Sequence, residues 1–458
     1  MSVAVVSHGR LAYLRGFGVR RVGQADPVDA DTVFALASLS KPLASTVIAA
    51  VVGEGAISWD DKIVARLPEF ALNEPWITRE VTLRDMLCHR SGLPDHAGDL
   101  LEDIGYDREE IIQRLRYVKL SGAFRASYAY TNFGFTVGAL AAARAAGKPW
   151  EDLCSERLYR RLGMDSTSSR YADLEARKNR AFGHVRRGGD WVVGPQRDPD
   201  AQAPAGGVSS SARDLAAWLQ LQLAHGAFQG REIVAAQALD ETHRPQIVSG
   251  PADPTKAAPQ FYGLGWDIGY AENPLVHWGH SGAFSMGAAT SVSILPAENL
   301  GIVALSNSAP VGAPEAVCRS FIDLVRIGKI HRDWLTLFGG VFAKMEEPAY
   351  GGERDYNSAP NGAAPSAALS AYAGTYVNEL YGPLTISASP TGLSLSVGRG
   401  KAPYIMRHFS GSLFTFQPVG ENAAGPSPLR FTLDDKGRAQ SVVIDYFNTT
   451  GQGLFVRA

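Results

Sequence analysis

A serine and a lysine stand three residues apart in Ser38-Leu39-Ser40-Lys41, where a segment with helical apolar periodicity begins. Positions i and i+3 of a helix share one face, so the hydroxyl of Ser38 and the ammonium of Lys41 are expected to meet. A free serine is a weak nucleophile that needs an adjacent base, and lysine takes that role when burial or nearby positive charge lowers its pKa. In the first turn, unpaired backbone N–H groups also point toward a developing oxyanion. The spacing makes Ser38 a candidate nucleophile, although about one such pair is expected by chance in a chain of this composition, and alone it fits a plain helix start.

A tyrosine two residues before an asparagine offers a second group for proton transfer. Tyr130-Thr131-Asn132 places a phenol, a general base when it is near a lysine ammonium, beside an amide that both donates and accepts hydrogen bonds. The same Tyr-x-Asn triplet begins at Tyr376 and at Tyr446, in segments predicted to be packed strands. Sequence context therefore favours Tyr130 as the base and Asn132 as a substrate-binding group.

A third candidate segment, His280-Ser281-Gly282, opens a predicted strand. A basic or hydrogen-bonding side chain, a hydroxyl and a glycine on an edge strand are able to line one wall of a cleft, where a glycine lets a substrate backbone lie close. The N–H of the following Ala283 is then in reach of an oxyanion. We expect these three residues to bind substrate.

The elements that must position these groups form two predicted domains. Residues 1–20 have the pattern of a β-hairpin, helical periodicity follows from 38 onward, strands return over 261–308, and a last helix covers 314–327. Strands at both ends with helices between them predict an α+β (α/β) domain whose sheet is closed by distant parts of the chain. A segment over 346–368, rich in proline and glycine, has the composition of a linker. Beyond it, short strands at regular spacing predict a barrel or a sandwich, which gives domains at 1–345 and 369–458.

The composition of the 458-residue chain excludes several classes of protein. Lys plus Arg number 44 and Asp plus Glu 46, so the net charge of −2 gives no electrostatic reason to expect nucleic acid or an anionic membrane. No apolar run approaches the ~20 residues that span a bilayer. Cys88, Cys154 and Cys318 form neither a disulfide framework nor a paired metal motif. We expect a small-molecule or peptide substrate, no cofactor and no metal, with homo-oligomers left open. The chain as it stands indicates the cytoplasm, and a removed leader would indicate the periplasm or secretion.

Taken together and in this order, the three motifs resemble the serine β-lactamase and penicillin-binding superfamily, in particular its class C β-lactamase-type hydrolases. Those hydrolases include D-aminopeptidases, D,D-peptidases and family VIII carboxylesterases. The resemblance covers residues 3–330, and the stretches 81–93, 162–164 and 205–215 within that range support it. The tail from 369 resembles the lipocalin-like domain of some members. The resemblance implies a β-lactamase/transpeptidase-like fold with an antiparallel sheet, and a lipocalin-like barrel. It further implies Ser38 as nucleophile, Lys41 and Tyr130 as its activating pair, and the N–H groups of Ser38 and Ala283 as the oxyanion hole.

One departure from the pattern affects the expected substrate. Many members carry a lysine in the third motif, and here His280 replaces it. Loss of that fixed charge weakens the case for binding a substrate carboxylate, and a histidine there resembles D-aminopeptidase-like and esterase-like members. We therefore expect cleavage of an amide or peptide bond, as in a D-aminopeptidase or D,D-peptidase. A carboxylesterase of the family VIII type is the first alternative, and a slow-turnover penicillin-binding sensor or scaffold is the second.

Two other hypotheses are weaker. Gly279-His280-Ser281-Gly282-Ala283 has the form of an α/β-hydrolase nucleophile elbow, but the elbow lies between a strand and a helix, and a strand-like segment follows here. A metal site at His277 and His280 lacks a third ligand nearby, and a strand places the two rings on opposite faces.

Overall fold

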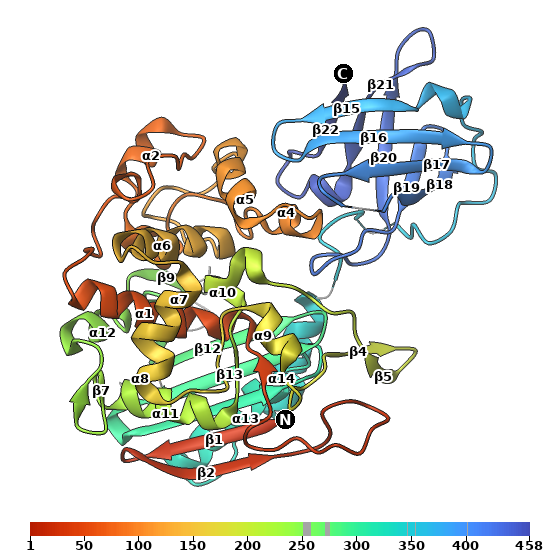
Figure 1. The fold of residues 1–458 in the computed structure, drawn as a ribbon. Helices are drawn as coiled ribbons and strands as arrows, with labels where there is room; N and C mark the ends of the chain where they lie inside the picture. The colour runs from red at the N-terminus through yellow and green to blue at the C-terminus, as the bar shows by residue number, and fades with distance from the viewer. Residues whose placement is uncertain (251–257, 271–274, 346, 353, 401) are drawn as a thin grey trace. The chain divides into compact units, whose positions relative to one another are not determined.

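The structure is a computed structural model that describes residues 1–250, 258–270, 275–345, 347–352, 354–400 and 402–458. The chain divides into two compact units (Figure 1). Unit 1 comprises Met1–His96 and Leu120–Ala343, and unit 2 comprises Ala97–Lys119 and Lys344–Ala458. Residues 271–274 of the predicted strand region, and 346 and 353 of the predicted linker, lie outside the described residues.

Unit 1 is built on a sheet that, among the described residues, has eight strands in the order β2-β1-β14-β13-β12-β11-β10-β9. Every neighbouring pair is antiparallel. Because β1 pairs with β14, the first strand of the unit and its last strand are neighbours in one sheet, as the sequence predicts. The strands are β1 (Ser2–Ser7), β2 (Arg10–Gly16), β9 (Ile247–Gly250), β10 (Gln260–Tyr262), β11 (Asp267–Tyr270), β12 (Val276–Phe284), β13 (Ala288–Leu295) and β14 (Leu300–Ser306).

Helices cover both faces of this sheet (Figure 1). Helix α13 (Ala313–Ile327) packs on one face, where Val5, Ile302 and Cys318 belong to one buried apolar cluster. Helix α11 (Ala212–Leu223) packs on the other face, and Gly301 leaves space there for Leu219, since an added Cβ would come within 3.2 Å of that side chain. This second face is the one that carries the candidate site.

Helix α1 (Ser40–Gly53) is a core helix, buried along almost its whole length. It packs against α6 (Asn132–Ala145), α10 (Ala203–Gly206) and α12 (Ala236–Thr242). The other helices of unit 1 are α2 (Pro75–Glu80), α3 (Leu83–Leu87), α7 (Trp150–Cys154), α8 (Arg160–Leu162), α9 (Tyr171–Ala176) and α14 (Trp334–Met345), which extends two residues beyond the unit. None of the helices in the described residues is long and apolar enough to cross a membrane.

Unit 2 contains a closed antiparallel barrel, which confirms the predicted all-β C-terminal region. Its strands are β15 (Gly374–Asn378), β16 (Gly382–Ser389), β17 (Gly392–Val397), β18 (Tyr404–Ser410), β19 (Leu413–Phe416), β20 (Ser427–Leu433), β21 (Ala439–Ile444) and β22 (Leu454–Arg457). The sequence analysis did not identify β18. A β-bulge between His408 and Ser410 breaks the two-residue alternation there, so the pattern is weak.

The segment 97–119 packs with the barrel, which the division at residue 345 did not anticipate. It carries α4 (Asp99–Asp103) and α5 (Arg108–Arg114). The carboxylate of Asp103 accepts hydrogen bonds from the Tyr446 hydroxyl at 2.8 Å and from the backbone N–H groups of Glu421 and Asn422 at 2.9 and 3.0 Å. Unit 2 therefore combines two stretches of chain that are far apart in the sequence.

The described part of the predicted linker is also attached to the barrel. Its residues form no helix or strand before 369 among those described, as its composition predicts. However, Tyr350 is buried, packs edge-on against Tyr446 at 5.3 Å and donates a hydrogen bond to the Gly425 carbonyl. Tyr356 packs against Phe409 at 5.0 Å. Aromatic burial gives this segment a fixed place on unit 2.

Candidate active site

Ser38 lies in a tight turn between a short strand and the core helix. Strand β3 (Phe34–Ala35) pairs with β6 (Ser209–Ser210), and a 3-10 turn, η1 (Ala37–Leu39), leads directly into α1. Ala37 has a φ of +49°, an uncommon conformation for a residue with a side chain and one that often marks functional sites. Ser38 itself is half-buried, so its hydroxyl lies at the edge of the core.

Lys41 is fully buried and connects three parts of unit 1. Its ammonium Nζ donates hydrogen bonds to Ser38 Oγ at 3.1 Å, to Asn132 Oδ1 at 2.7 Å and to the Ala205 carbonyl at 3.0 Å. Three acceptors match the three N–H donors of an ammonium, which compensates the cost of burying the charge. The same Nζ lies 4.4 Å from the centre of the Tyr130 ring. The structure therefore brings together Ser38, Lys41, Tyr130 and Asn132.

Tyr130 and Asn132 reach this position from the start of α6. Thr131 is the N-cap residue of this helix, so Tyr130 precedes the helix and Asn132 begins it. The Tyr130 carbonyl accepts a hydrogen bond from the His96 N–H at 2.7 Å, and its ring lies 6.4 Å from that of His280. The other two Tyr-x-Asn triplets lie in unit 2, where Tyr376 and Tyr446 are buried.

His280 projects from β12 with both ring nitrogens engaged. Nδ1 lies 2.6 Å from the Ser281 carbonyl, which only accepts, so Nδ1 carries the proton. Nε2 then accepts a hydrogen bond from the Tyr262 hydroxyl at 2.9 Å. Burial, with a smaller effect from the Lys41 charge, lowers the pKa of His280 to about 3. Residue 280 is thus a neutral hydrogen-bonding group in place of the fixed positive charge of a lysine.

The other residues of the third motif have different surroundings. Ser281 alternates with His280 along β12, and its side chain neighbours Glu315 at the start of α13, on the opposite face of the sheet. The structure therefore does not bring the Ser281 hydroxyl to Lys41. Gly282 lies against η1: an added Cβ would come within 2.2 Å of the Leu36 carbonyl oxygen and 2.8 Å of the Leu39 nitrogen. Glycine is needed at 282 because β12 packs directly on the turn that carries Ser38.

His89 belongs to the site, although the sequence analysis did not single it out. Its carbonyl accepts a hydrogen bond from the Ala129 N–H at 2.9 Å, and its Nδ1 accepts one from the Thr131 N–H at 3.1 Å. Its ring lies 4.5 Å from that of Tyr130. His89 thus holds the residues on both sides of Tyr130, and its φ of +60° accompanies this arrangement. The available signal was its place in the stretch 81–93.

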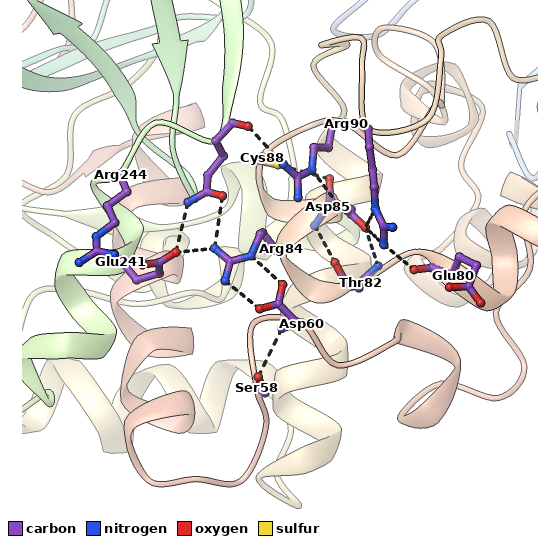
Figure 2. A network of polar contacts seen from close by, with 12 residues as sticks. Ser58, Asp60, Glu80, Thr82, Arg84, Asp85, Cys88, Arg90, Glu241 and Arg244 are labelled. Carbon is purple, nitrogen blue, oxygen red and sulfur yellow. Dashed lines mark hydrogen bonds and ion pairs between the residues drawn. The ribbon is translucent and has the colours of Figure 1, made fainter.

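The loops that carry His89 and Tyr130 are held by the buried carboxylate of Asp85. Figure 2 shows Asp85 within its network of polar contacts. Asp85 forms a capping box with Thr82 at the start of α3, and its two oxygens accept hydrogen bonds from Arg90 at 2.7 Å and Arg125 at 2.9 Å. Burial alone would raise the pKa of Asp85, but the hydrogen bonds from Arg125 and Arg90 hold it below its usual range. Arg90 also donates to the Gln246 carbonyl.

This network extends to the partner of His280. The Gln246 N–H donates a hydrogen bond to the Tyr262 carbonyl at 2.9 Å, so Arg90 is connected through Gln246 to β10. Burial raises the pKa of Tyr262 well above its ordinary value, so this hydroxyl stays protonated. It therefore donates a hydrogen bond to His280. One set of contacts therefore positions both Tyr130 and His280.

Comparisons with known proteins identify the family of this chain. A family model described as beta-lactamase matches residues 1–326, which is more than half of the chain. The chain belongs to the beta-lactamase family. A second model, described as a domain of unknown function (DUF3471), matches residues 358–455 and so covers the barrel.

Relatives of this chain include proteins named as hydrolases and as penicillin-binding proteins. The unguisins hydrolase of Aspergillus campestris is 25% identical over 84% of this chain and 74% of its own length. The D-alanyl-D-alanine-carboxypeptidase/endopeptidase AmpH of Escherichia coli is 28% identical over 49% of this chain and 58% of its own length. The solved structure of an octameric penicillin-binding protein homologue from Pyrococcus abyssi shares the fold, with a TM-score of 0.64 and 18% identity over 100% of this chain and 95% of the other. The protein is a serine hydrolase of the β-lactamase and penicillin-binding type.

Proposed function

We propose that Ser38 attacks the carbonyl carbon of an amide bond and forms an acyl-enzyme, with Lys41 and Tyr130 as the proton-transfer pair. The observation that carries this proposal is the position of the Lys41 ammonium, 3.1 Å from Ser38 Oγ and 4.4 Å from the centre of the Tyr130 ring. A positive charge between the two hydroxyl-bearing side chains stabilises whichever of them loses its proton. Asn132, also bound to Lys41, is proposed to orient the substrate amide.

In the proposed cycle, the Tyr130 phenolate takes the proton of Ser38 as Oγ bonds to the carbonyl carbon. The carbonyl oxygen becomes an oxyanion, stabilised by the N–H groups of Ser38 and Ala283. Tyr130 then gives its proton to the departing nitrogen, the C–N bond breaks and the amine leaves. A water molecule loses a proton to Tyr130 and attacks the ester, and Ser38 recovers its proton as the acid is released.

The surroundings of His280 support a substrate without a free carboxylate at that position. A neutral imidazole whose two nitrogens are engaged supplies no charge to hold such a group. We therefore propose amide substrates of the D-aminopeptidase type ahead of D,D-peptides and β-lactams. Esters of the kind cleaved by family VIII carboxylesterases are the second candidate, because they too need no cation.

A fluorophosphonate probe followed by a substrate panel tests this proposal. We expect the probe to label Ser38, and the Ser38→Ala variant to remain unlabelled. The panel comprises D-amino-acid amides, D-Ala-D-Ala peptides, short p-nitrophenyl esters and nitrocefin, and we expect the highest kcat/KM on the amides. Labelling of Ser281 in place of Ser38 would overturn the mechanism. Release of one product equivalent without turnover on every substrate would favour a slow-turnover binding protein.

A further inference from the structure

A cavity of about 90 Å3, partly open to solvent, lies in unit 1 beside the candidate site. We call it the Phe284 cavity. Its walls come from β3, α9, β5 (Asp190–Val193), the loop at 194–199, the segment 206–209 and the chain from Phe284 to Ala288. Glycines bring parts of this wall together: an added Cβ at Gly183 or Gly194 would come within 2.8 or 2.7 Å of the Met286 carbonyl oxygen.

One wall of the cavity is shared with the catalytic turn. The segment 205–209 offers the Ala205 carbonyl to Lys41, and the next residue, Gly206, lines the cavity. The Val208 carbonyl accepts a hydrogen bond from the Leu36 N–H at 2.9 Å, two residues before Ser38. Phe284 directly follows Ala283, and its ring packs with Ala37 in one buried cluster. The cavity therefore adjoins Ser38 through the elements on either side of the proposed oxyanion hole.

The lining favours an apolar ligand group. Leu174, Phe182, Val193 and Phe284 are among the apolar side chains around the space. The guanidinium of Arg197 lies over the Phe284 ring at 4.1 Å. The absence of a side chain at Gly206 leaves space beside Phe284, because a Cβ added at Gly206 would lie 3.4 Å from the edge of that ring. The lining also includes polar side chains such as Arg180, Gln196 and Asn307. Mainly apolar walls with a small number of polar groups are typical of small-molecule pockets.

The positions of the proton-transfer groups decide which part of a substrate enters. A leaving group must depart next to Tyr130, which is proposed to protonate it. The rings in contact with Tyr130, those of His89, His96, Tyr262 and His280, do not line the cavity. We propose that the Phe284 cavity receives an apolar side chain, aromatic or aliphatic, of the acyl group that becomes attached to Ser38. This inference rests on the proposed function and adds a substrate class to it.

Activated esters with acyl chains of increasing length test the cavity. For the wild-type protein, kcat/KM on p-nitrophenyl acetate, butyrate and hexanoate should rise by up to roughly fourfold for each methylene that becomes buried. Leu174→Trp, which fills the cavity from α9, should lower the hexanoate-to-acetate ratio of kcat/KM at least tenfold. The matched control, Leu324→Trp at a half-exposed position on α13, should leave the ratio unchanged. Val193→Phe fills the cavity from β5 and replaces Leu174→Trp if that variant does not fold.

Three outcomes contradict the inference in distinguishable ways. If both cavity variants lower the rates on all three esters equally, the cavity does not bind the acyl chain. If they lower the rate on 4-methylumbelliferyl acetate and spare p-nitrophenyl hexanoate, the cavity binds the leaving group. If mass spectrometry finds no acyl group on Ser38 of the wild-type protein with any ester, the proposed function itself fails. Acylation of Ser38 with an altered chain-length ratio supports both proposals.

Discussion

The ring of His89 packs against the ring of Tyr130 at 4.5 Å, while its main chain and side chain accept hydrogen bonds from the residues on either side of that tyrosine. Because Nδ1 is the acceptor, the ring is neutral, and burial together with the nearby Lys41 charge lowers the pKa of His89 well below its ordinary value. His89 is thus placed to orient Tyr130 without titrating itself.

Replacement of His89 should affect turnover more than substrate binding. We expect His89→Ala to lower kcat at least tenfold with KM within threefold, and to shift the pH profile of kcat because Tyr130 loses its fixed position. His89→Asn should recover much of the loss, since an asparagine oxygen accepts the Thr131 N–H and asparagine tolerates positive φ.

A matched control for His89 exists in the same unit. His225 also has a positive φ, of 50°, but its side chain is exposed and contacts Asp240. His225→Ala should leave kcat and its pH profile unchanged. Equal losses in His89→Ala and His89→Asn, or a lower melting temperature with unchanged kcat, would show that His89 only packs.

Tyr130 and Lys41 should act as one unit in proton transfer. General acid–base groups contribute about 10²–10⁴-fold, so Tyr130→Phe and Lys41→Ala should each lose at least 10²-fold in kcat/KM. The double variant should lose far less than the product of the two losses, because either change disables the same step. Tyr446→Phe, in another Tyr-x-Asn triplet, should leave the rate near that of the wild type. Fully multiplicative losses would indicate separate roles.

A charge at position 280 should change substrate preference. His280→Lys restores a cation, and a hydrogen bond to a charged group contributes roughly 1.5–3 kcal/mol. We expect the kcat/KM on substrates with a free terminal carboxylate, relative to neutral amides, to rise roughly tenfold or more. His280→Gln, which stays neutral, is the control. If the ranking of substrates is the same in both variants, His280 serves packing with Tyr262 and not selection.

Stability should depend on pH through buried histidines such as His243. This side chain stacks on Trp278 at 3.8 Å, and burial lowers the pKa of His243 to about 3. In the unfolded chain a histidine has a pKa of about 6.5, so between pH 6.5 and 3 the unfolded state binds a proton that the folded state does not. This contribution to the free energy of unfolding is complete above pH 6.5 and declines below it by about 1.4 kcal/mol per pH unit. Urea denaturation of His243→Phe between pH 6 and 5 should show a slope smaller by that amount, and an equal slope would mean that His243 is protonated in the folded protein.

Asp103 should hold the segment 97–119 to the rest of unit 2. In Asp103→Ala the Tyr446 hydroxyl and two backbone N–H groups lose their acceptor, at a cost of about 1–3 kcal/mol for each donor left buried and unsatisfied. We expect limited proteolysis of the full chain to cut faster within 97–119. Glu109→Ala, at an exposed position of the same segment, is the control. Unchanged cleavage in Asp103→Ala would mean that other contacts hold the segment.

Local patterns in the sequence were sufficient for the elements whose signals are short-range. The pair of Ser38 and Lys41 was predictable because a helix brings positions i and i+3 together whatever surrounds it. The terminal hairpin and most barrel strands follow from alternation along a few residues, whereas the bulge in β18 hid that strand. The strand predicted to open at His280 begins at Val276 instead, and β12 is an interior strand between β13 and β11, not an edge strand. Gly282 correctly indicated a close approach of backbone at this position. The group that approaches it is the turn η1, however, and not a substrate.

The relationships that make the site were decided by tertiary structure. The hydrogen bond of Tyr262 to His280, the contact of His89 with Tyr130 and the attachment of Asp103 to Tyr446 join residues 18, 41 and 343 positions apart. No periodic pattern records such contacts, since each depends on how separate elements pack. Burial likewise fixes the charge of His280, because the cost of desolvation depends on the neighbours that exclude water and not on the residue type. The sequence by itself determined the candidate nucleophile, its helix and the family resemblance, and the packing of distant segments decided which groups surround them and in what state of charge.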